Sequence, residues 1–231
     1  MGLRNFVAKE PRPLPIIVLA DTSASMLGEK INELNLALRT MLESLNAVDD
    51  IRGVFQLCII AFGGNEARVV QPLANVSDIS LQELTAFGKT PMGDAFALAT
   101  KIIEDKSIVT SRSYIPTIVL ISDGIPNGFH KDISIDKFMS WKPLQTLQKS
   151  PRASKSQRLA LGIGRDVNVE MLRAFINNDE IPLIKSKDSA GIAKFFNWVT
   201  MSTIARMTRA TPDLASVVAP IFDIDEEDII I

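Results

Sequence analysis

Oxygen-bearing side chains follow two apolar runs of the sequence and open one amphipathic segment. Asp21, Ser23 and Ser25 come directly after the run LPIIVLA, and Asp123 comes directly after TIVLIS. Thr90 precedes a segment with helical periodicity, in the sequence GKTPMGDAF. Hydroxyl and carboxylate oxygens are the ligands that Mg²⁺ and Mn²⁺ prefer in proteins. We therefore predict that one divalent cation, Mg²⁺ or Mn²⁺, is bound by Asp21, Ser23, Ser25, Thr90 and Asp123.

The D-x-S-x-S spacing indicates how three of these side chains converge. Alternate residues of an extended segment point the same way, so Asp21, Ser23 and Ser25 are expected to face one point. Serine hydroxyls bind a cation without neutralising it, and two aspartates balance only its formal charge. The ion then stays electrophilic toward a further anionic oxygen. A carboxylate from a partner protein is the group that this chemistry favours.

Each motif also has a purely local explanation. Ser and Asp are favoured at helix N-termini and Asp-Gly pairs at turns, so DTSAS could be a helix cap and ISDG a turn. The metal site is favoured because all three motifs occur together, in order and beside the appropriate elements.

The elements that must position these motifs alternate between short β-branched runs and amphipathic segments. This pattern is typical of a parallel sheet covered by helices on both faces. The glycine pair at residues 63–64 predicts a hairpin, which makes the third strand an antiparallel edge. Ligand groups gather at the carboxyl ends of strands in such a sheet, so DTSAS and ISDG should meet there. Strands are predicted over 14–20, 54–62, 67–71, 117–122, 159–163 and 181–184, and helices over 29–45, 92–105, 135–148, 169–176 and 190–204.

Composition and charge bear on the compartment and the class of partner. The chain has 231 residues, with 25 Lys and Arg against 27 Asp and Glu, so no basic excess indicates a nucleic-acid or anionic-membrane partner. The apolar runs are too short to span a bilayer, and the N-terminal sequence has no signal-peptide core. A single cysteine, Cys58, fits a reducing compartment. We expect a cytoplasmic protein that binds neither nucleic acid nor membrane.

The residue types argue against catalysis. With one histidine, His130, and one cysteine, a His/Cys zinc site is excluded, and a catalytic triad would have to use His130. A phosphatase of the haloacid-dehalogenase type needs an acid/base aspartate at position 23, where this chain has serine. The GxGxxV sequence over 162–167 lacks the third glycine of a dinucleotide-binding loop and is interpreted as a turn. We therefore expect no enzyme activity.

Three smaller features are assigned structural or surface roles. Trp141 and Trp198 are expected to be packing residues, and the basic segment 149–158, with four cations, to be a solvated loop. Apolar residues close to the predicted metal are expected to form an exposed rim that suits a protein interface. These rim residues are Met26, Leu27, Met92, Gly124, Ile125, Pro126 and Phe129.

The three motifs together resemble the metal-ion-dependent adhesion site of von Willebrand factor A (VWA) domains. The resemblance covers roughly residues 13–204, which leaves an N-terminal segment, 1–12, and a tail, 205–231, with the acidic end DIDEEDIII. It implies an α/β, Rossmann-like fold with a six-stranded, mostly parallel sheet, one antiparallel edge strand and helices on both faces. It also implies that Ser23, Ser25 and Thr90 are direct ligands, and that Asp21 and Asp123 act directly or through water.

A narrower resemblance is carried by four phrases of the sequence. LPIIVLADTSASMLGEKINELNLAL, GKTPMGDAF, LISDGIPN and FFNWV are similar to TerY-like proteins of bacterial tellurium-resistance clusters. That similarity implies a cytoplasmic, non-catalytic module of a stress response, with a protein kinase, a phosphatase or another tellurium-resistance protein as partner. Two alternatives stay open: a metal-dependent phosphoester hydrolase, and a regulatory subunit of a kinase/phosphatase signalling complex.

Overall fold

The computed structural model describes residues 10–48, 53–130, 132–164, 167–186, 189–208 and 229–230. Within these residues one sheet is formed, with the strand order β3-β2-β1-β4-β5-β6-β7. Its first six strands along the chain match the six predicted ones. The strands are β1 (Arg12–Asp21), β2 (Gly53–Gly63), β3 (Glu66–Asn75), β4 (Thr117–Ser122), β5 (Gln157–Ile163), β6 (Leu183–Ser186) and β7 (Ile229–Ile230).

The direction of the strands confirms the predicted fold class. Strands β2, β1, β4, β5 and β6 run parallel, and β3 pairs antiparallel with β2 at one edge, as the glycine pair predicts. At the other edge, Ile229 and Ile230 pair antiparallel with Ile184 and Leu183 of β6. This short strand comes from the segment assigned to the tail and was not predicted. We call the end of the sheet at which the parallel strands stop the carboxyl end, and the end at which they start the amino end.

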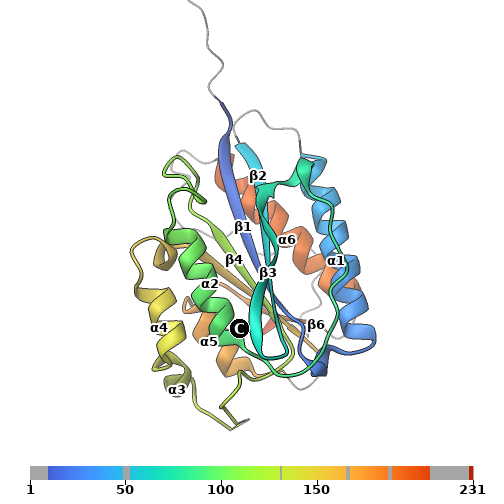
Figure 1. Cartoon of the computed structure of the whole chain (residues 1–231), viewed down its shortest axis with the longest axis vertical. Helices are drawn as coiled ribbons and strands as arrows, with labels where there is room; N and C mark the ends of the chain where they lie inside the picture. The colour runs from blue at the N-terminus through green and yellow to red at the C-terminus, as the bar shows by residue number, and fades with distance from the viewer. Residues whose placement is uncertain are drawn as a thin grey trace, which may run out of the picture.

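Helices cover both faces of the sheet (Figure 1). On one face α1 packs against α6, and on the other α2 packs against α4 and, through the stacked rings of Phe96 and Phe175, against α5. This division follows from right-handed crossovers between parallel strands, which change face where the strand order reverses. The helices are α1 (Glu29–Asn46), α2 (Met92–Glu104), α3 (Ile135–Met139), α4 (Lys142–Lys149), α5 (Val169–Ile176) and α6 (Ser189–Thr208).

The apolar patterns of the sequence explain why these elements form. All of β4 and β5, and β1 from Leu14 onward, are buried, as expected of strands covered on both faces. Helix α1 buries a stripe of apolar residues at three- and four-residue intervals, among them Leu34, Leu38 and Met41. No helix in the described ranges is both long enough and apolar enough to cross a membrane.

The predicted helix over 135–148 is two helices, because the chain turns at Ser140 and Trp141. Pro143 has no backbone N–H and therefore fits the first turn of a new helix better than the interior of a long one. Trp141 lies at this junction, with its ring centroid 5.7 Å from that of Phe96 and 5.1 Å from that of Phe129. It is a packing residue, as predicted, and so is the buried Trp198, which lies against Phe195.

The basic segment 149–158 was predicted to be a solvated loop. It instead contains a 3₁₀ turn and the start of β5, and several of its residues are buried. Arg152 donates hydrogen bonds to the carbonyl oxygens of Ile103 and Val109, beside the end of α2. Arg158 is buried and donates to the carbonyl oxygen of Phe175 at the end of α5. Counting cations could not reveal this, because arginine can also cap the unpaired carbonyl groups at helix ends.

Candidate functional site

The carboxyl ends of β1 and β4 lie side by side, because the two strands pair in parallel up to Ala20 and Ile121. Asp21 is the last residue of β1, and Asp123 follows the last residue of β4. Beyond β1 the chain forms a single 3₁₀ turn, Ala24–Met26, which places Ser23 and Ser25 on the same side as Asp123. The topology therefore brings DTSAS and ISDG together, as predicted.

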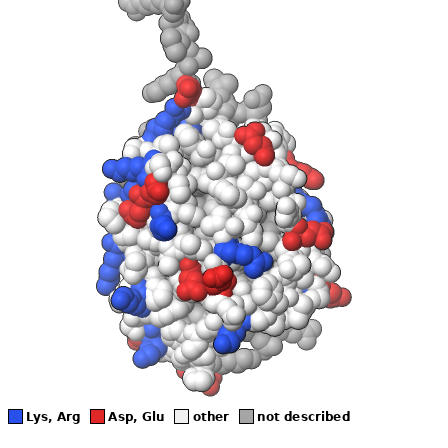
Figure 2. Space-filling model, in the orientation of Figure 1, with Lys and Arg blue, Asp and Glu red and all other residues white. Residues whose placement is uncertain are grey.

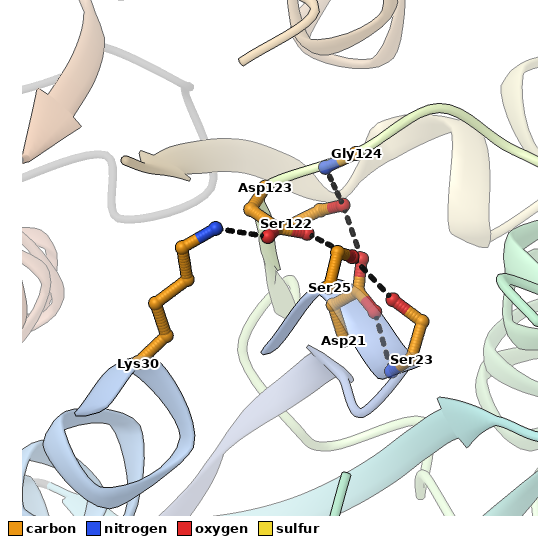
Figure 3. Close-up of polar contacts among 7 residues, drawn as sticks. All are labelled: Asp21, Ser23, Ser25, Lys30, Ser122, Asp123 and Gly124. Atoms are coloured by element: carbon orange, nitrogen blue, oxygen red, sulfur yellow. Dashed lines mark hydrogen bonds and ion pairs between the residues drawn. The ribbon is translucent and has the colours of Figure 1, made fainter. Parts of the chain in front are cut away.

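A chain of hydrogen bonds links these side chains (Figure 3). Ser25 Oγ donates to Asp123 Oδ1 at 2.7 Å, and the hydroxyl oxygens of Ser23 and Ser25 lie 3.0 Å apart. Asp21 is oriented from both sides, since its Oδ1 accepts the backbone N–H of Ser23 at 2.9 Å and its Oδ2 accepts the hydroxyl of Ser122 at 2.5 Å. Four of the five predicted residues, together with Ser122, thus form one connected polar cluster.

The spacing of the oxygen atoms in this cluster fits an octahedral cation. Adjacent ligands of Mg²⁺ at about 2.1 Å lie about 3.0 Å from each other. The separations of 3.0 Å from Ser23 Oγ to Ser25 Oγ and of 2.7 Å from Ser25 Oγ to Asp123 Oδ1 are close to this value. Within the described residues no three His, Cys, Asp or Glu side chains are grouped as metal ligands. Hydroxyl oxygens would therefore have to supply part of the coordination of a cation here.

Asp21 is fully buried, and no cation of the described residues is paired with it. Burial raises its pKa from 3.8 to about 6, against the opposing effect of hydrogen bonds from Ser122 and Ser23, and the charge of Asp123 adds a smaller upward shift. A positive ion beside Asp21 would stabilise its charged form. A bound cation would therefore offset the cost of burying the negative charge of Asp21.

Thr90 is tied to the site through its backbone. Its N–H donates to Oδ1 of Asn127 at 2.9 Å, and its carbonyl oxygen accepts the N–H of Asn127 at 3.1 Å. Two residues earlier, the carbonyl oxygen of Gly88 accepts the N–H of Ala24. The segment that carries Thr90 is therefore held between the DTSAS loop and the loop after β4. That the Thr90 hydroxyl is a metal ligand stays a prediction.

Two residues of the polar cluster were not found from the sequence. Ser122 precedes Asp123 in ISDG and could have been suspected from that position. Lys30, in the first turn of α1, has its Nζ 2.5 Å from Asp123 Oδ2 (Figure 3), with the two side chains 37% and 2% exposed. No sequence signal pairs Lys30 with a residue 93 positions away.

The apolar rim differs from its prediction. Met26 and Met92 are fully buried core residues, Pro126 is also buried, and Phe129 is partly buried against Phe138. Met26 ends the 3₁₀ turn after β1 and Met92 begins α2, and both of these elements turn that side chain into the core.

The exposed apolar residues beside the DTSAS loop are Leu27 and Phe87, at 62% and 45% exposure. Leu27 was predicted and Phe87 was not. The Phe87 N–H donates to the carbonyl oxygen of Thr22 at 2.8 Å, which fixes it next to the loop. Its ring lies over Gly64, where any larger residue would collide with it.

The glycines of the GxGxxV sequence have packing roles. A Cβ on Gly162 would lie 2.5 Å from Cγ1 of Val167, and Gly164 has a φ of 95°, which a side chain strongly disfavours. The turn that was expected here accounts for both glycines without a bound nucleotide.

Comparison with known proteins identifies the fold. Residues 16–125, which contain all five predicted metal ligands, match the family model described as "von Willebrand factor type A domain". No curated protein matches the chain by sequence.

Three solved structures illustrate the likeness. A von Willebrand factor type A protein from Catenulispora acidiphila is 20% identical with a TM-score of 0.61, and the match covers 84% of this chain and 43% of that one. Proximal thread matrix protein 1 of the mussel byssus, with a zinc-occupied metal-ion-dependent adhesion site motif, is 15% identical with a TM-score of 0.59, covering 85% and 46%. The von Willebrand factor domain of the pilus tip protein Mfa5 from Porphyromonas gingivalis is 11% identical with a TM-score of 0.58, covering 91% and 99%.

This chain therefore spans less than half the length of the first two proteins and nearly all of the third. At these identities the likeness concerns the fold, which is the Rossmann-like α/β fold of a VWA domain.

Proposed function

We propose that this chain is a non-catalytic protein-binding module that holds one divalent cation, Mg²⁺ or Mn²⁺, and uses it to bind a carboxylate of a partner protein. VWA domains generally mediate metal-dependent protein–protein interactions. The observation that carries the proposal is the cluster of Ser23, Ser25 and Asp123 oxygen atoms, whose separations fit an octahedral cation at the carboxyl end of the sheet. The zinc-occupied adhesion site of the mussel protein supports a metal at the equivalent place in this fold.

Each residue of the site has a distinct role in the proposal. Ser23, Ser25 and Thr90 supply neutral hydroxyl oxygens to the ion, and Asp21 and Asp123 supply charge directly or through water. Asp21 is held by Ser122, and Asp123 by Ser25 and Lys30. The two carboxylates balance only the formal charge of a divalent ion, and the hydroxyl ligands do not neutralise it, so the ion stays electrophilic. A partner's Asp or Glu would supply the further anionic oxygen.

The surface around the cluster suits a protein partner. Leu27 and Phe87 present exposed apolar side chains beside the DTSAS loop, where they could exclude water and strengthen a metal–carboxylate bond. Basic and acidic side chains are mixed over the face seen in Figure 2. A partner segment with an acidic residue beside apolar ones would fit Leu27, Phe87 and the proposed metal.

The cellular role is proposed from the narrower sequence resemblance. The phrases shared with TerY-like proteins support a cytoplasmic module of a bacterial tellurium-resistance-like stress response. A kinase, a phosphatase or another protein of that system is the first partner to test.

Calorimetric titration tests the metal site. Metal-stripped wild-type protein should bind one Mg²⁺ or Mn²⁺, and the double variant Asp21→Ala, Ser23→Ala should lose at least about 100-fold in affinity, since a charge and a direct ligand are removed. The matched control is Ser44→Ala, which removes an exposed hydroxyl on α1. Equal affinity of the wild-type protein and the double variant would refute the assignment.

Partner binding tests the mechanism. Affinity should fall at least about tenfold in chelator, and Thr90→Ala should weaken partner binding more than metal binding, because a partner carboxylate draws the ion toward this position. Candidate partners can be found by capture with and without chelator, followed by mass spectrometry. Equal affinity in Mg²⁺, in chelator and with Thr90→Ala would mean that another surface binds the partner.

A further inference from the structure

The carboxylate of Asp123 has both of its oxygens engaged. Oδ1 accepts the hydroxyl of Ser25 at 2.7 Å, and Oδ2 accepts the ammonium group of Lys30 at 2.5 Å. The Asp123 side chain is almost completely buried, so solvent screens this ion pair poorly. Asp21, the other acidic residue of the cluster, is oriented by a serine hydroxyl and a backbone N–H. Lys30 therefore supplies the positive charge that the polar cluster has without a bound metal.

We propose that Lys30 is a built-in competitor of the divalent metal: it holds Asp123 while the site lacks a metal and is displaced from Asp123 when a metal binds. This inference rests on the proposed function, because it concerns the regulation of the same site. A divalent ion that takes Asp123 Oδ1 as a ligand lies on one side of a single carboxylate, with the ammonium group on the other. Like charges so close together repel each other, and the low exposure of Asp123 makes that repulsion strong.

The surroundings of Lys30 give its side chain a place at the site and a way out. Its aliphatic chain passes over Gly164, where an added Cβ would lie 3.2 Å from Lys30 Cε and 3.4 Å from Nζ. The glycine leaves the room that the ammonium group needs to reach Asp123. Because the Lys30 side chain is 37% exposed, a change of rotamer carries its charge into solvent without repacking the core.

Competition of this kind makes the metal and the partner depend on each other. Without a partner, the ion can bind only by breaking the ion pair of Lys30 with Asp123, so its affinity is low. A partner carboxylate adds a ligand and a negative charge beside the ion, which offsets this cost. The ion and the partner should therefore bind cooperatively, and the cation should be held tightly only in the complex.

Titration of metal-stripped variants tests the competition. Lys30→Met, which keeps a long apolar side chain but no charge, should bind Mg²⁺ about tenfold or more tightly than the wild-type protein. Lys30→Arg, which keeps the charge, should stay within about threefold of the wild-type affinity. Lys106→Met is the matched control, because Lys106 is exposed and lies beyond the far end of α2; it should leave the affinity unchanged.

Reductive methylation of the wild-type protein tests the displacement without any substitution. Saturating Mg²⁺ should raise the rate of Lys30 modification about threefold or more, since an ammonium group released from an ion pair is more available to the reagent. Lys106 provides the internal reference in the same mass spectra. An unchanged Lys30 rate overturns the displacement.

The outcomes separate this inference from the proposed function. If the wild-type protein binds Mg²⁺ and Lys30→Met binds it equally or more weakly, Lys30 is a structural ion pair and the competition is refuted, while the metal site stands. If neither protein binds Mg²⁺ or Mn²⁺, both proposals fail together.

Discussion

Buried or partly buried charged groups occur at both ends of the sheet, but their partners differ. At the amino end, Arg152 and Arg158 donate to backbone carbonyl groups at the ends of α2 and α5, and Glu104 accepts the backbone N–H groups of Arg152 and Ala153. At the carboxyl end, the polar side chains of the cluster bond mainly to one another, and within the described part of the chain no cation pairs with Asp21. The first arrangement has its hydrogen bonds satisfied by the fold, whereas the second would be completed by the proposed cation.

The two ends of the sheet differ in the groups that satisfy their charged side chains. This difference distinguishes charges that stabilise the fold from charges that could bind a ligand. A charged side chain that caps helix ends has its hydrogen bonds satisfied by groups that the fold always presents. A cluster whose acid is buried and has its pKa raised stores an unfavourable interaction that a bound cation relieves. Substitutions at the two ends should therefore affect different measured quantities.

The largest expected effect is at the amino end. Arg152→Ala should lower the free energy of unfolding by about 3 kcal/mol, because it leaves the carbonyl oxygens of Ile103 and Val109 without their charged donor. Its Mg²⁺ affinity should equal that of the wild-type protein. Urea denaturation and calorimetry measure the two quantities, with the exposed Lys155→Ala as control. An Arg152→Ala variant with unchanged stability and altered Mg²⁺ affinity would contradict the assignment of a purely structural role to Arg152.

A smaller effect on stability, of opposite sign, is expected at the carboxyl end. In metal-stripped protein at neutral pH, Asp21→Asn should raise the free energy of unfolding by about 1 to 2 kcal/mol, since it removes a buried charge and keeps the shape of the side chain. The same variant should bind Mg²⁺ much more weakly. Asp21→Asn should therefore stabilise the metal-stripped protein and weaken its metal binding.

The pH dependence gives this prediction a sign that can be checked. Because the pKa of Asp21 is raised from 3.8 to about 6, the folded state holds its proton more tightly than the unfolded state does between these values. The free energy of unfolding of the metal-stripped wild-type protein should therefore fall, relative to Asp21→Asn, as the pH rises through this window. Denaturation at about pH 4 and about pH 7.5 measures it. An equal difference at both pH values would contradict the assigned cause.

The smallest effect is expected in the core between the two ends. Cys58 is fully buried in β2, and burial raises its pKa to about 12. A thiol reagent should leave it unmodified in the native protein, with or without Mg²⁺, and should modify it fully in denaturant. Rapid labelling of the native protein would mean that β2 opens locally and that the sheet does not hold the two ends rigidly.

The fold class and four residues of the candidate cluster could be predicted from local sequence patterns. The short, β-branched apolar runs before Asp21 and Asp123 favour buried strands, and buried parallel strands bring their carboxyl ends together. Ser23 and Ser25 follow from the same local spacing. The helix over 169–176 has the predicted bounds because its periodicity records which of its sides is buried. The strand over 117–122 has them because it is a continuous run buried on both faces.

The contacts that long charged side chains make with distant residues depend on the tertiary structure and could not be predicted. The ion pair of Lys30 with Asp123 spans 93 positions, and the hydrogen bonds of Arg152 to Ile103 and Val109 span 49 and 43. The burial of Met26 and the exposure of Phe87 were decided in the same way. Periodicity records a residue's own environment, whereas the partner of a flexible charged side chain depends on which backbone the fold carries within its reach. A local pattern can therefore indicate candidate ligands of a cation, but not that Lys30 pairs with one of them.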